Sequence, residues 1–256
     1  MQTPDDYLAI YQSQPRWRLI NEPPAPDPDA ALKRDTELLK EVAAGKRGAT
    51  ARLWEVPQCL VVTRKETRFP HFADAVAQLS DQGWPVIVRD SGGTTVPLHL
   101  GILNFSLLFP QQEGETFDLD SVYTALCEPI RGALAQLGLI AEYGATEGSY
   151  CDGRYNLNIQ GLKVTGTAQK LMISPPNPKG VKQGILAQAM LMVEADAAQG
   201  TEWVNRFYQL AGNERRFDPM VATSIESLLP ETKPQGELTL QLRQQIAESF
   251  SHLAAN

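Results

Sequence analysis

One cysteine lies in a sequence context that suits nucleophilic chemistry. Cys151 occurs in the polar, glycine-flanked segment 148–155 (GSYCDGRY), whereas Cys59 lies in an apolar strand-like segment and Cys127 on the apolar side of a predicted helix. A cysteine thiolate is a strong nucleophile, and a loop position gives it access to a substrate. The alternative is the commoner one, a free cysteine that packs as a small hydrophobic side chain. Spacing alone leaves both interpretations open.

Lys163 is a candidate electrostatic partner for this thiol. It lies in segment 155–166 (YNLNIQGLKVTG), where apolar and polar residues alternate and a central Gln-Gly pair predicts the turn of a hairpin. Alternation places Lys163 on the face opposite its two apolar neighbours. If that face meets the Cys151 loop, the ammonium would lower the thiol pKa and stabilise negative charge on an acyl oxygen. The alternative is a solvent-facing lysine.

A glycine-containing loop and one histidine complete the candidate features. Residues 89–95 (RDSGGTT) follow a predicted strand, and the two glycines would let the backbone approach a ligand, although a tight turn is the alternative. The loop has neither a Walker ending nor a GxGxxG fingerprint. His99 lies in the apolar segment 97–100 (PLHL), so a structural or substrate-lining role suits it as well as a Cys–His dyad. No cluster has metal-ligand spacing, and no metal site is expected.

The elements that would position these residues form an α/β (α+β) arrangement, a mixed sheet flanked by helices rather than a βαβ series. Hydrophobic periodicity and turn residues predict strands at 17–20, 53–63 in two parts, 85–89, 100–109, 155–166 as a hairpin, and 186–193. Capping residues and 3.6-residue periodicity predict helices at 29–45 with Asp29 as N-cap, 73–79, 121–138, 199–211 and 237–253.

Composition excludes several classes of protein. A net charge of −7 argues against a nucleic-acid binder, which needs a basic surface for the phosphates. The sequence has no apolar run of roughly 18 residues, and so no membrane span is expected. The first residues do not resemble a signal peptide, and three cysteines without a CxxC pair suit a reducing compartment. We therefore expect a cytoplasmic protein.

Two linked motifs resemble the lipoate/biotin protein ligase superfamily. Segments 89–96 (RDSGGTTV) and 100–106 (LGILNFS) are similar to the family pattern RRSGGGxV…LGNLNxS. Segment 153–170 (GRYNLNIQGLKVTGTAQK) is similar to GRxDLxxxGxKxxGxAxR, whose lysine falls on Lys163. The resemblance covers residues 17–230. It implies a lipoate-protein ligase A-like catalytic domain of the class II synthetase/biotin-lipoate ligase type, with a mixed, largely antiparallel sheet.

Within this superfamily the chain is most similar to the cysteine-dependent octanoyltransferase and lipoyl amidotransferase branch. That branch carries GSYCPGxYDL, where this chain has GSYCDGRYNL at 148–157. The resemblance implies that Cys151 takes an octanoyl or lipoyl group as a thioester, and that Lys163 contacts the acyl carbonyl. The implied acyl- and substrate-binding residues are Arg89, Ser91, Gly92, Gly93, Thr94, His99, Gly153, Tyr155, Gly166, Thr167 and Ala168.

Departures from the ligase pattern favour the transferase. ATP-dependent ligases have a third glycine where this chain has Thr94, a His-Asp pair where it has Leu98 and His99, and an asparagine where it has Tyr155. Against the transferase motif, Asp152 replaces a proline and an aspartate near the histidine is missing. The acyl donor and acceptor therefore stay open.

Three functional hypotheses follow. The first is ping-pong acyl transfer through a Cys151 thioester, which needs no cofactor. The second is an ATP- and Mg-dependent lipoate-protein ligase that uses Lys163, and the third is a non-catalytic homologue that binds the carrier. In each case the expected partners are lipoyl domains and the glycine cleavage H protein, with no nucleic acid or membrane, and we expect a monomer. The predicted organisation is an N-terminal extension (1–16), a catalytic domain (17–230) and a C-terminal helix (231–256).

Overall fold

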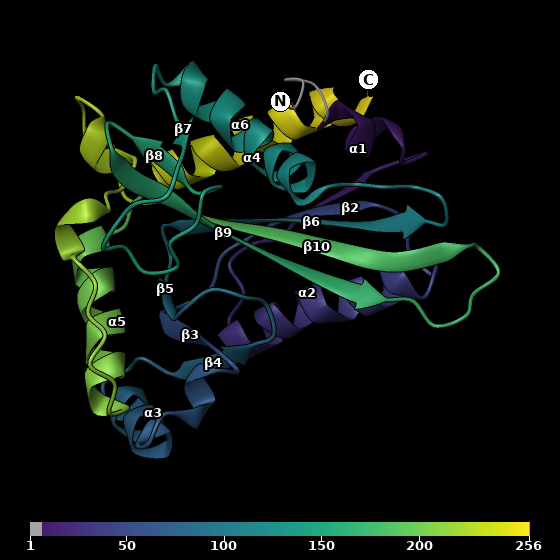
Figure 1. The fold of residues 1–256 in the computed structure, drawn as a ribbon. Helices are drawn as coiled ribbons and strands as arrows, with labels where there is room; N and C mark the ends of the chain where they lie inside the picture. The colour runs from purple at the N-terminus through teal and green to yellow at the C-terminus, as the bar shows by residue number, and fades with distance from the viewer. Residues whose placement is uncertain (1–6, 256) are drawn as a thin grey trace.

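Two β-sheets organise the fold in the computed structural model, which describes residues 7–255 (Figure 1). The strands are β1 (Arg18–Asn21), β2 (Thr50–Trp54), β3 (Cys59–Thr63), β4 (Val86–Arg89), β5 (Val96–Leu98), β6 (Ile102–Gln112), β7 (Glu142–Tyr143), β8 (Leu157–Ile159), β9 (Leu162–Ile173) and β10 (Val181–Met192). The helices are α1 (Leu8–Gln12), α2 (Pro28–Ala43), α3 (Phe72–Asp81), α4 (Leu119–Gln136), α5 (Ala197–Leu210) and α6 (Glu237–Ala255), with short 3-10 turns η1 (Glu66–Arg68), η2 (Pro219–Val221) and η3 (Glu226–Leu228). Within 7–255, no helix is long and apolar enough to cross a membrane.

The larger sheet has the strand order β1-β2-β6-β10-β9-β8-β7. Its neighbours pair antiparallel except for β1 and β2, which are parallel. The smaller sheet has the order β4-β3-β5, with one parallel and one antiparallel pair. The predicted mixed, largely antiparallel sheet with flanking helices is therefore confirmed, but the separate three-stranded sheet was not predicted.

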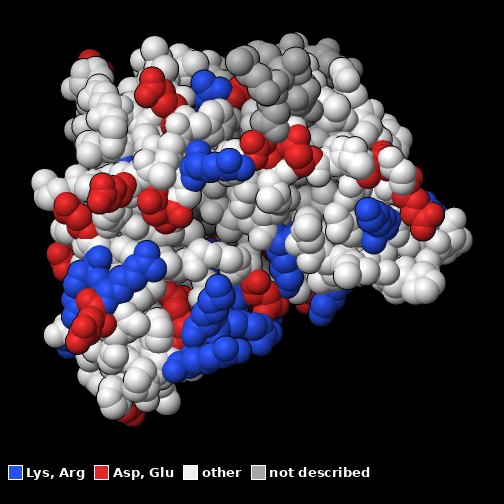
Figure 2. Space-filling view, viewed as in Figure 1, with Lys and Arg blue, Asp and Glu red and all other residues white. Residues whose placement is uncertain are grey.

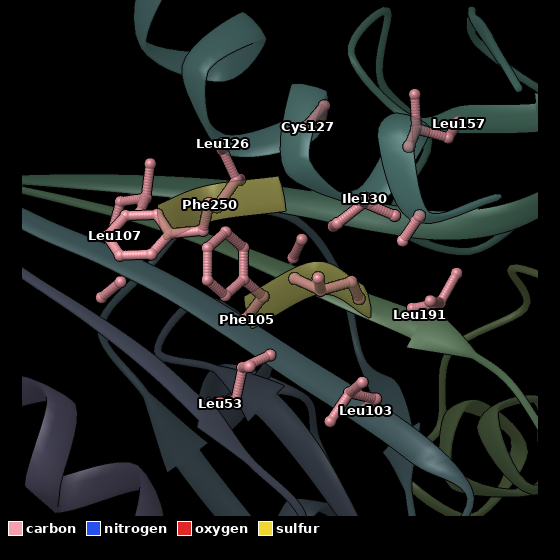
Figure 3. Packing of buried hydrophobic residues seen from close by; sticks show 14 of the residues in the cluster. Leu53, Leu103, Phe105, Leu107, Leu126, Cys127, Ile130, Leu157, Leu191 and Phe250 are labelled. Carbon is pink, nitrogen blue, oxygen red and sulfur yellow. The ribbon is translucent and has the colours of Figure 1, made fainter. Parts of the chain in front are cut away.

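Helices cover both faces of the larger sheet (Figure 1). α2 packs against β6 and β10 on one face, while α4 and α6 pack against each other and against the sheet on the other face. Between α4, α6 and the sheet lies the main hydrophobic core, in which Phe105, Leu107, Leu126, Ile130 and Phe250 interdigitate (Figure 3). These five side chains are at most 2% exposed. Because Phe250 belongs to α6, the C-terminal helix is part of this core.

The first turn of α2 differs from the prediction. Its N-cap is Asp27, whose side chain accepts a hydrogen bond from the Asp29 N–H at 2.9 Å, so the prediction of Asp29 as the cap was wrong. The reason is local, because Pro28 occupies the first helical position, where a fixed φ is favourable and no N–H is needed. The cap therefore moves two residues towards the N-terminus.

The predicted hairpin is present and extends further than its sequence pattern. Gln160 and Gly161 both have positive φ, 53° and 80°, as a two-residue turn of type I′ requires. Beyond this turn β9 continues to Ile173 and pairs with β10 from Thr165 onwards, whereas β8 reaches back only to Leu157, opposite Thr165. β9 is thus much longer than the strand on its other side.

Candidate active site

A cavity of about 740 Å³ lies between α2, the larger sheet and the smaller sheet. Its apolar wall includes Val61, Val96, Leu98 and Met190. Of the predicted site residues, six line it: Arg89, Ser91, Cys151, Gly166, Thr167 and Ala168. Lysine and arginine side chains gather over β3, β4 and the start of α2 beside this region (Figure 2). A long apolar wall with cations nearby suits a ligand that has an apolar chain and a polar or negatively charged end.

Cys151 is held in an unusual backbone conformation at the edge of this cavity. Its φ is +46°, in the left-handed region that L-residues other than glycine seldom adopt. Three hydrogen bonds hold it there. The Cys151 N–H donates to Thr94 Oγ1 at 2.7 Å, and its carbonyl accepts from Lys163 Nζ at 3.0 Å and from Asn156 Nδ2 at 2.9 Å. This network fixes the backbone of a cysteine that is only 6% exposed.

The loop between β4 and β5 lies directly on the sulfur. Arg89 Nη2 is 3.7 Å from Cys151 Sγ and also donates to the Thr94 carbonyl at 2.9 Å. A Cβ on Gly93 would lie 2.5 Å from Sγ and 2.9 Å from the Arg89 guanidinium, and the φ of Gly93 is +105°. Position 93 therefore requires glycine both for space and for backbone conformation. The sequence left open whether the two glycines form a tight turn or let the backbone approach a ligand. In the structure, Gly93 lets the backbone of this loop approach the Cys151 thiol.

Lys163 is fully buried against the Cys151 loop. Its Nζ donates to the Tyr150 carbonyl as well as to that of Cys151, and it lies 4.8 Å from the centre of the Tyr150 ring. The alternative of a solvent-facing lysine is thereby excluded. The segment after η2 covers it, because the Lys163 carbonyl accepts from the Thr223 N–H at 2.9 Å. A buried ammonium held by carbonyl groups places a positive charge beside the thiol.

The surroundings lower the pKa values of both the Cys151 thiol and the Lys163 ammonium. Burial raises the pKa of the Cys151 thiol, whereas the charges of Arg89 and Lys163 lower it. Backbone and side-chain hydrogen bonds from Thr94 and Arg89 lower it further, so that the thiol pKa falls below its ordinary value. Burial lowers the pKa of Lys163 to about 8, although the charges of Cys151 and Asp152 oppose that shift. A depressed thiol pKa next to fixed cations is the setting of a reactive cysteine.

Residues 27–251 match the family model described as the lipoyl protein ligase A/B catalytic domain. The chain belongs to this family. The lipoate-ligase resemblance predicted from the two sequence motifs is confirmed.

Similar proteins include two curated transferases and a solved ligase structure. The octanoyl-[GcvH]:protein N-octanoyltransferase of Kyrpidia tusciae is 35% identical over 246 residues, which are 96% of this chain and 82% of that protein. The lipoyl-[GcvH]:protein N-lipoyltransferase of Listeria monocytogenes is 28% identical over 83% of this chain and 77% of its own length. A bipartite lipoate protein ligase of Thermoplasma acidophilum, whose structure is described together with its E2 lipoyl domain, superposes with a TM-score of 0.59 at 16% identity. That match covers 94% of this chain and 84% of the ligase.

Asn156 is a structural member of this site that the sequence interpretation had not selected. It is fully buried, and its amide donates to the Cys151 carbonyl while its Oδ1 accepts from the Thr167 N–H at 3.0 Å. It therefore joins the Cys151 loop to β9. The available signal was the family motif itself, in which an aspartate stands at this position.

The buried carboxylate of Glu66 binds the end of the 90–95 loop. Glu66 accepts hydrogen bonds from the N–H and hydroxyl groups of Thr63 at 2.7 and 2.9 Å, and from those of Thr95 at 2.9 Å each. The hydroxyl of Tyr208 in α5 also donates to it. A buried carboxylate is costly unless it is hydrogen-bonded in this way. Local sequence does not mark Glu66, because two of its three partners, Thr95 and Tyr208, are distant in sequence.

Two predicted substrate-binding residues point elsewhere. His99 follows the end of β5 and does not line the cavity; its Nδ1 lies 2.6 Å from the Leu100 carbonyl. The apolar strand expected to bury it ends at Leu98. Tyr155 stacks on Tyr123 of α4, with ring centroids 4.5 Å apart, because the Cys151 loop turns towards α4 before β8 begins.

Four predicted glycine and threonine positions do not line the cavity but lie in the loops around it, and one of them is Gly93, described above. Gly92 is exposed, with open space around its Cβ position. Gly153 closes the turn after Cys151, since its carbonyl accepts from the Asn156 N–H at 3.0 Å. Thr94 contacts the Cys151 backbone, as described above. These residues shape the loops rather than the cavity wall.

Proposed function

We propose that this protein transfers octanoyl or lipoyl groups between lipoyl-carrier proteins through a thioester on Cys151. The observation that carries the proposal is the geometry at the sulfur. A nearly buried thiol lies 3.7 Å from the Arg89 guanidinium and next to the buried Lys163 ammonium, and it lines a cavity that has both an apolar wall and charged residues. The relatives curated as octanoyl-GcvH and lipoyl-GcvH transferases support the same reaction and suggest GcvH as the donor.

The first half-reaction forms the acyl-enzyme. The Cys151 thiolate attacks the amide carbonyl that joins the acyl group to the donor lysine, and a tetrahedral oxyanion forms. The positive charge of Lys163 stabilises this oxyanion, and the Arg89 Nε–H, which is buried without a hydrogen-bond partner, is free to donate to it. The C–N bond then breaks, the donor nitrogen takes a proton from the medium and leaves as an amine, and a thioester remains on Cys151.

The second half-reaction regenerates the thiol. The neutral amine of the acceptor lysine attacks the thioester carbonyl, the C–S bond breaks, and Cys151 leaves as a thiolate that Arg89 and Lys163 stabilise. The amine proton returns to the medium or to the thiolate. One lysine amide is exchanged for another, so the bond energies balance and no nucleotide is consumed. The acyl chain would lie along Val61, Val96, Leu98 and Met190.

A single-turnover experiment tests this function. The protein is incubated with octanoyl-GcvH alone, and mass spectrometry of its peptides should show an octanoyl adduct on Cys151. Addition of an apo lipoyl domain should remove the adduct and octanoylate the domain. Cys151→Ser should do neither, and an active Cys151→Ser protein would refute the thioester. Pyrophosphate release that depends on lipoate and ATP would establish the ligase instead, and carrier binding without any transfer would establish a binding protein.

A further inference from the structure

The outer edge of β9 is an unpaired strand edge beside the cavity. β10 pairs with β9 along Thr165–Ile173, but on the other side β8 reaches only from Leu162 to Thr165. Within the described chain, no strand pairs with the outer side of residues 168–173. β9 is therefore an edge strand over its second half, although it lies inside the strand order of the sheet (Figure 1).

The direction of the backbone along this edge follows from two hydrogen bonds. The Thr167 N–H points outwards, because it donates to Asn156 Oδ1 on the β8 side. The Ser174 N–H points inwards, because it donates to the Lys182 carbonyl at 3.1 Å. Antiparallel strands alternate in this respect, so Gln169, Leu171 and Ile173 direct their N–H and C=O groups to the open edge. An extended segment could pair with all three residues.

The side chains on this edge are also incompletely covered. Leu171 is 49% and Ile173 is 84% exposed, although both are large and apolar. The Oε1 atom of Gln169 is buried and accepts no hydrogen bond. Exposed apolar residues on an open strand edge favour aggregation unless a partner covers them. The edge thus has the properties of a strand-addition site.

Charge indicates which kind of partner would bind. From Gly153 to Val193 the sequence contains no aspartate or glutamate, although the whole chain has a net charge of −7. Of the five basic residues in this stretch, Lys163 is buried, and Arg154 and Lys170 pair with Asp120 and Asp90. The exposed cations near the end of β9 are therefore Lys179 and Lys182. A second copy of the chain would bring the same cations to the edge, whereas an acidic segment would be attracted to it.

We propose that residues Gln169–Ile173 of β9 bind an extended, acidic segment of the acyl carrier by strand addition. This rests on the proposed function. Gly166, Ala168 and Lys170 of the same strand line the cavity together with Cys151. A strand added about 4.8 Å outside β9 would direct alternate side chains to the cavity face, which is where the acceptor lysine must arrive. The edge therefore selects the carrier and aligns its lysine with the thioester.

The decisive variant removes one outward N–H without disturbing the inner pairing. In Leu171→Pro the ring replaces an N–H that no residue of the described chain accepts, and edge strands tolerate such prolines. Leu171→Ala is the matched control, since it shortens the side chain and keeps the N–H. With octanoyl-GcvH and an apo lipoyl domain, Leu171→Pro should raise the KM for the carrier roughly tenfold, because strand pairing is lost along the edge. Leu171→Ala should raise it much less. Both should keep the wild-type rate of Cys151 alkylation by iodoacetamide.

A charge variant keeps the test valid if the proline variant does not fold. Lys179→Glu/Lys182→Glu changes two exposed residues outside the cavity, and it should raise the same KM and reduce its salt dependence. An unchanged KM in this double variant, or equal KM values for Leu171→Pro and Leu171→Ala, would overturn the docking proposal. So would a wild-type dimer in sedimentation that Leu171→Pro makes monomeric. No transfer by the wild-type protein would instead reject the proposed function.

Discussion

Removal of the Arg89 charge should raise the pKa of the Cys151 thiol. The guanidinium lies 3.7 Å from Sγ. Two unit charges about 4 Å apart interact by about 4 kcal/mol at an effective dielectric constant of about 20, and about 1.4 kcal/mol corresponds to one pKa unit. The upper limit is therefore about three units. Because Arg89 is half-buried and Lys163 remains in place, we expect an increase of about one to two units in Arg89→Gln.

The pH dependence of Cys151 alkylation by iodoacetamide measures this shift. A folded-state thiol pKa below its ordinary value means that thiolate is present at lower pH, so loss of the cation should move the rising limb to higher pH. At a pH where the thiol is mostly protonated, each unit lowers the thiolate fraction about tenfold. Arg64→Gln is the matched control, because Arg64 also borders the cavity but pairs with Asp90 rather than with the thiol. If Arg89→Gln and wild type had the same midpoint, the electrostatic explanation of the site would be wrong.

Three further results are expected from the same structure. Gly93→Ala should slow alkylation at least about tenfold and lower the free energy of unfolding in urea by about 1–2 kcal/mol, because its Cβ would meet Sγ and its φ is positive; unchanged behaviour would contradict the close approach. Asn156→Ala should lower that free energy by about 2–4 kcal/mol, since it leaves the Cys151 carbonyl and the Thr167 N–H each short of a partner. An unfolding free energy unchanged within error would show that the link between the Cys151 loop and β9 is unimportant. The transfer rate should fall above a pH of about 8, where the buried Lys163 ammonium, whose pKa burial lowers to about 8, loses its proton; Lys163→Met should be slow at every pH and lack this falling limb. A wild-type profile that is flat through this range would refute the role of the charge.

Local sequence patterns predicted most of the elements of this protein. The turn at Gln160–Gly161, the two strands around Pro57 and the helix through Leu126 and Ile130 all follow from short-range periodicity and turn chemistry. These features depend on residues a few positions apart, so the sequence contains the necessary information directly. The family motifs added the identity of the lysine and the cysteine as candidates.

Only the tertiary structure decided what those candidates contact. Arg89 and Cys151 are 62 positions apart, and nothing in their local sequences indicates that one lies 3.7 Å from the other. Likewise the burial of Lys163 depends on the distant segment that covers it. Tyr155 points away from the cavity because its ring stacks on Tyr123 of α4. A nucleophile becomes reactive through long-range contacts that set its charge environment and its exposure. Periodicity reports which face of an element is apolar, whereas the packing of distant elements determines what meets that face.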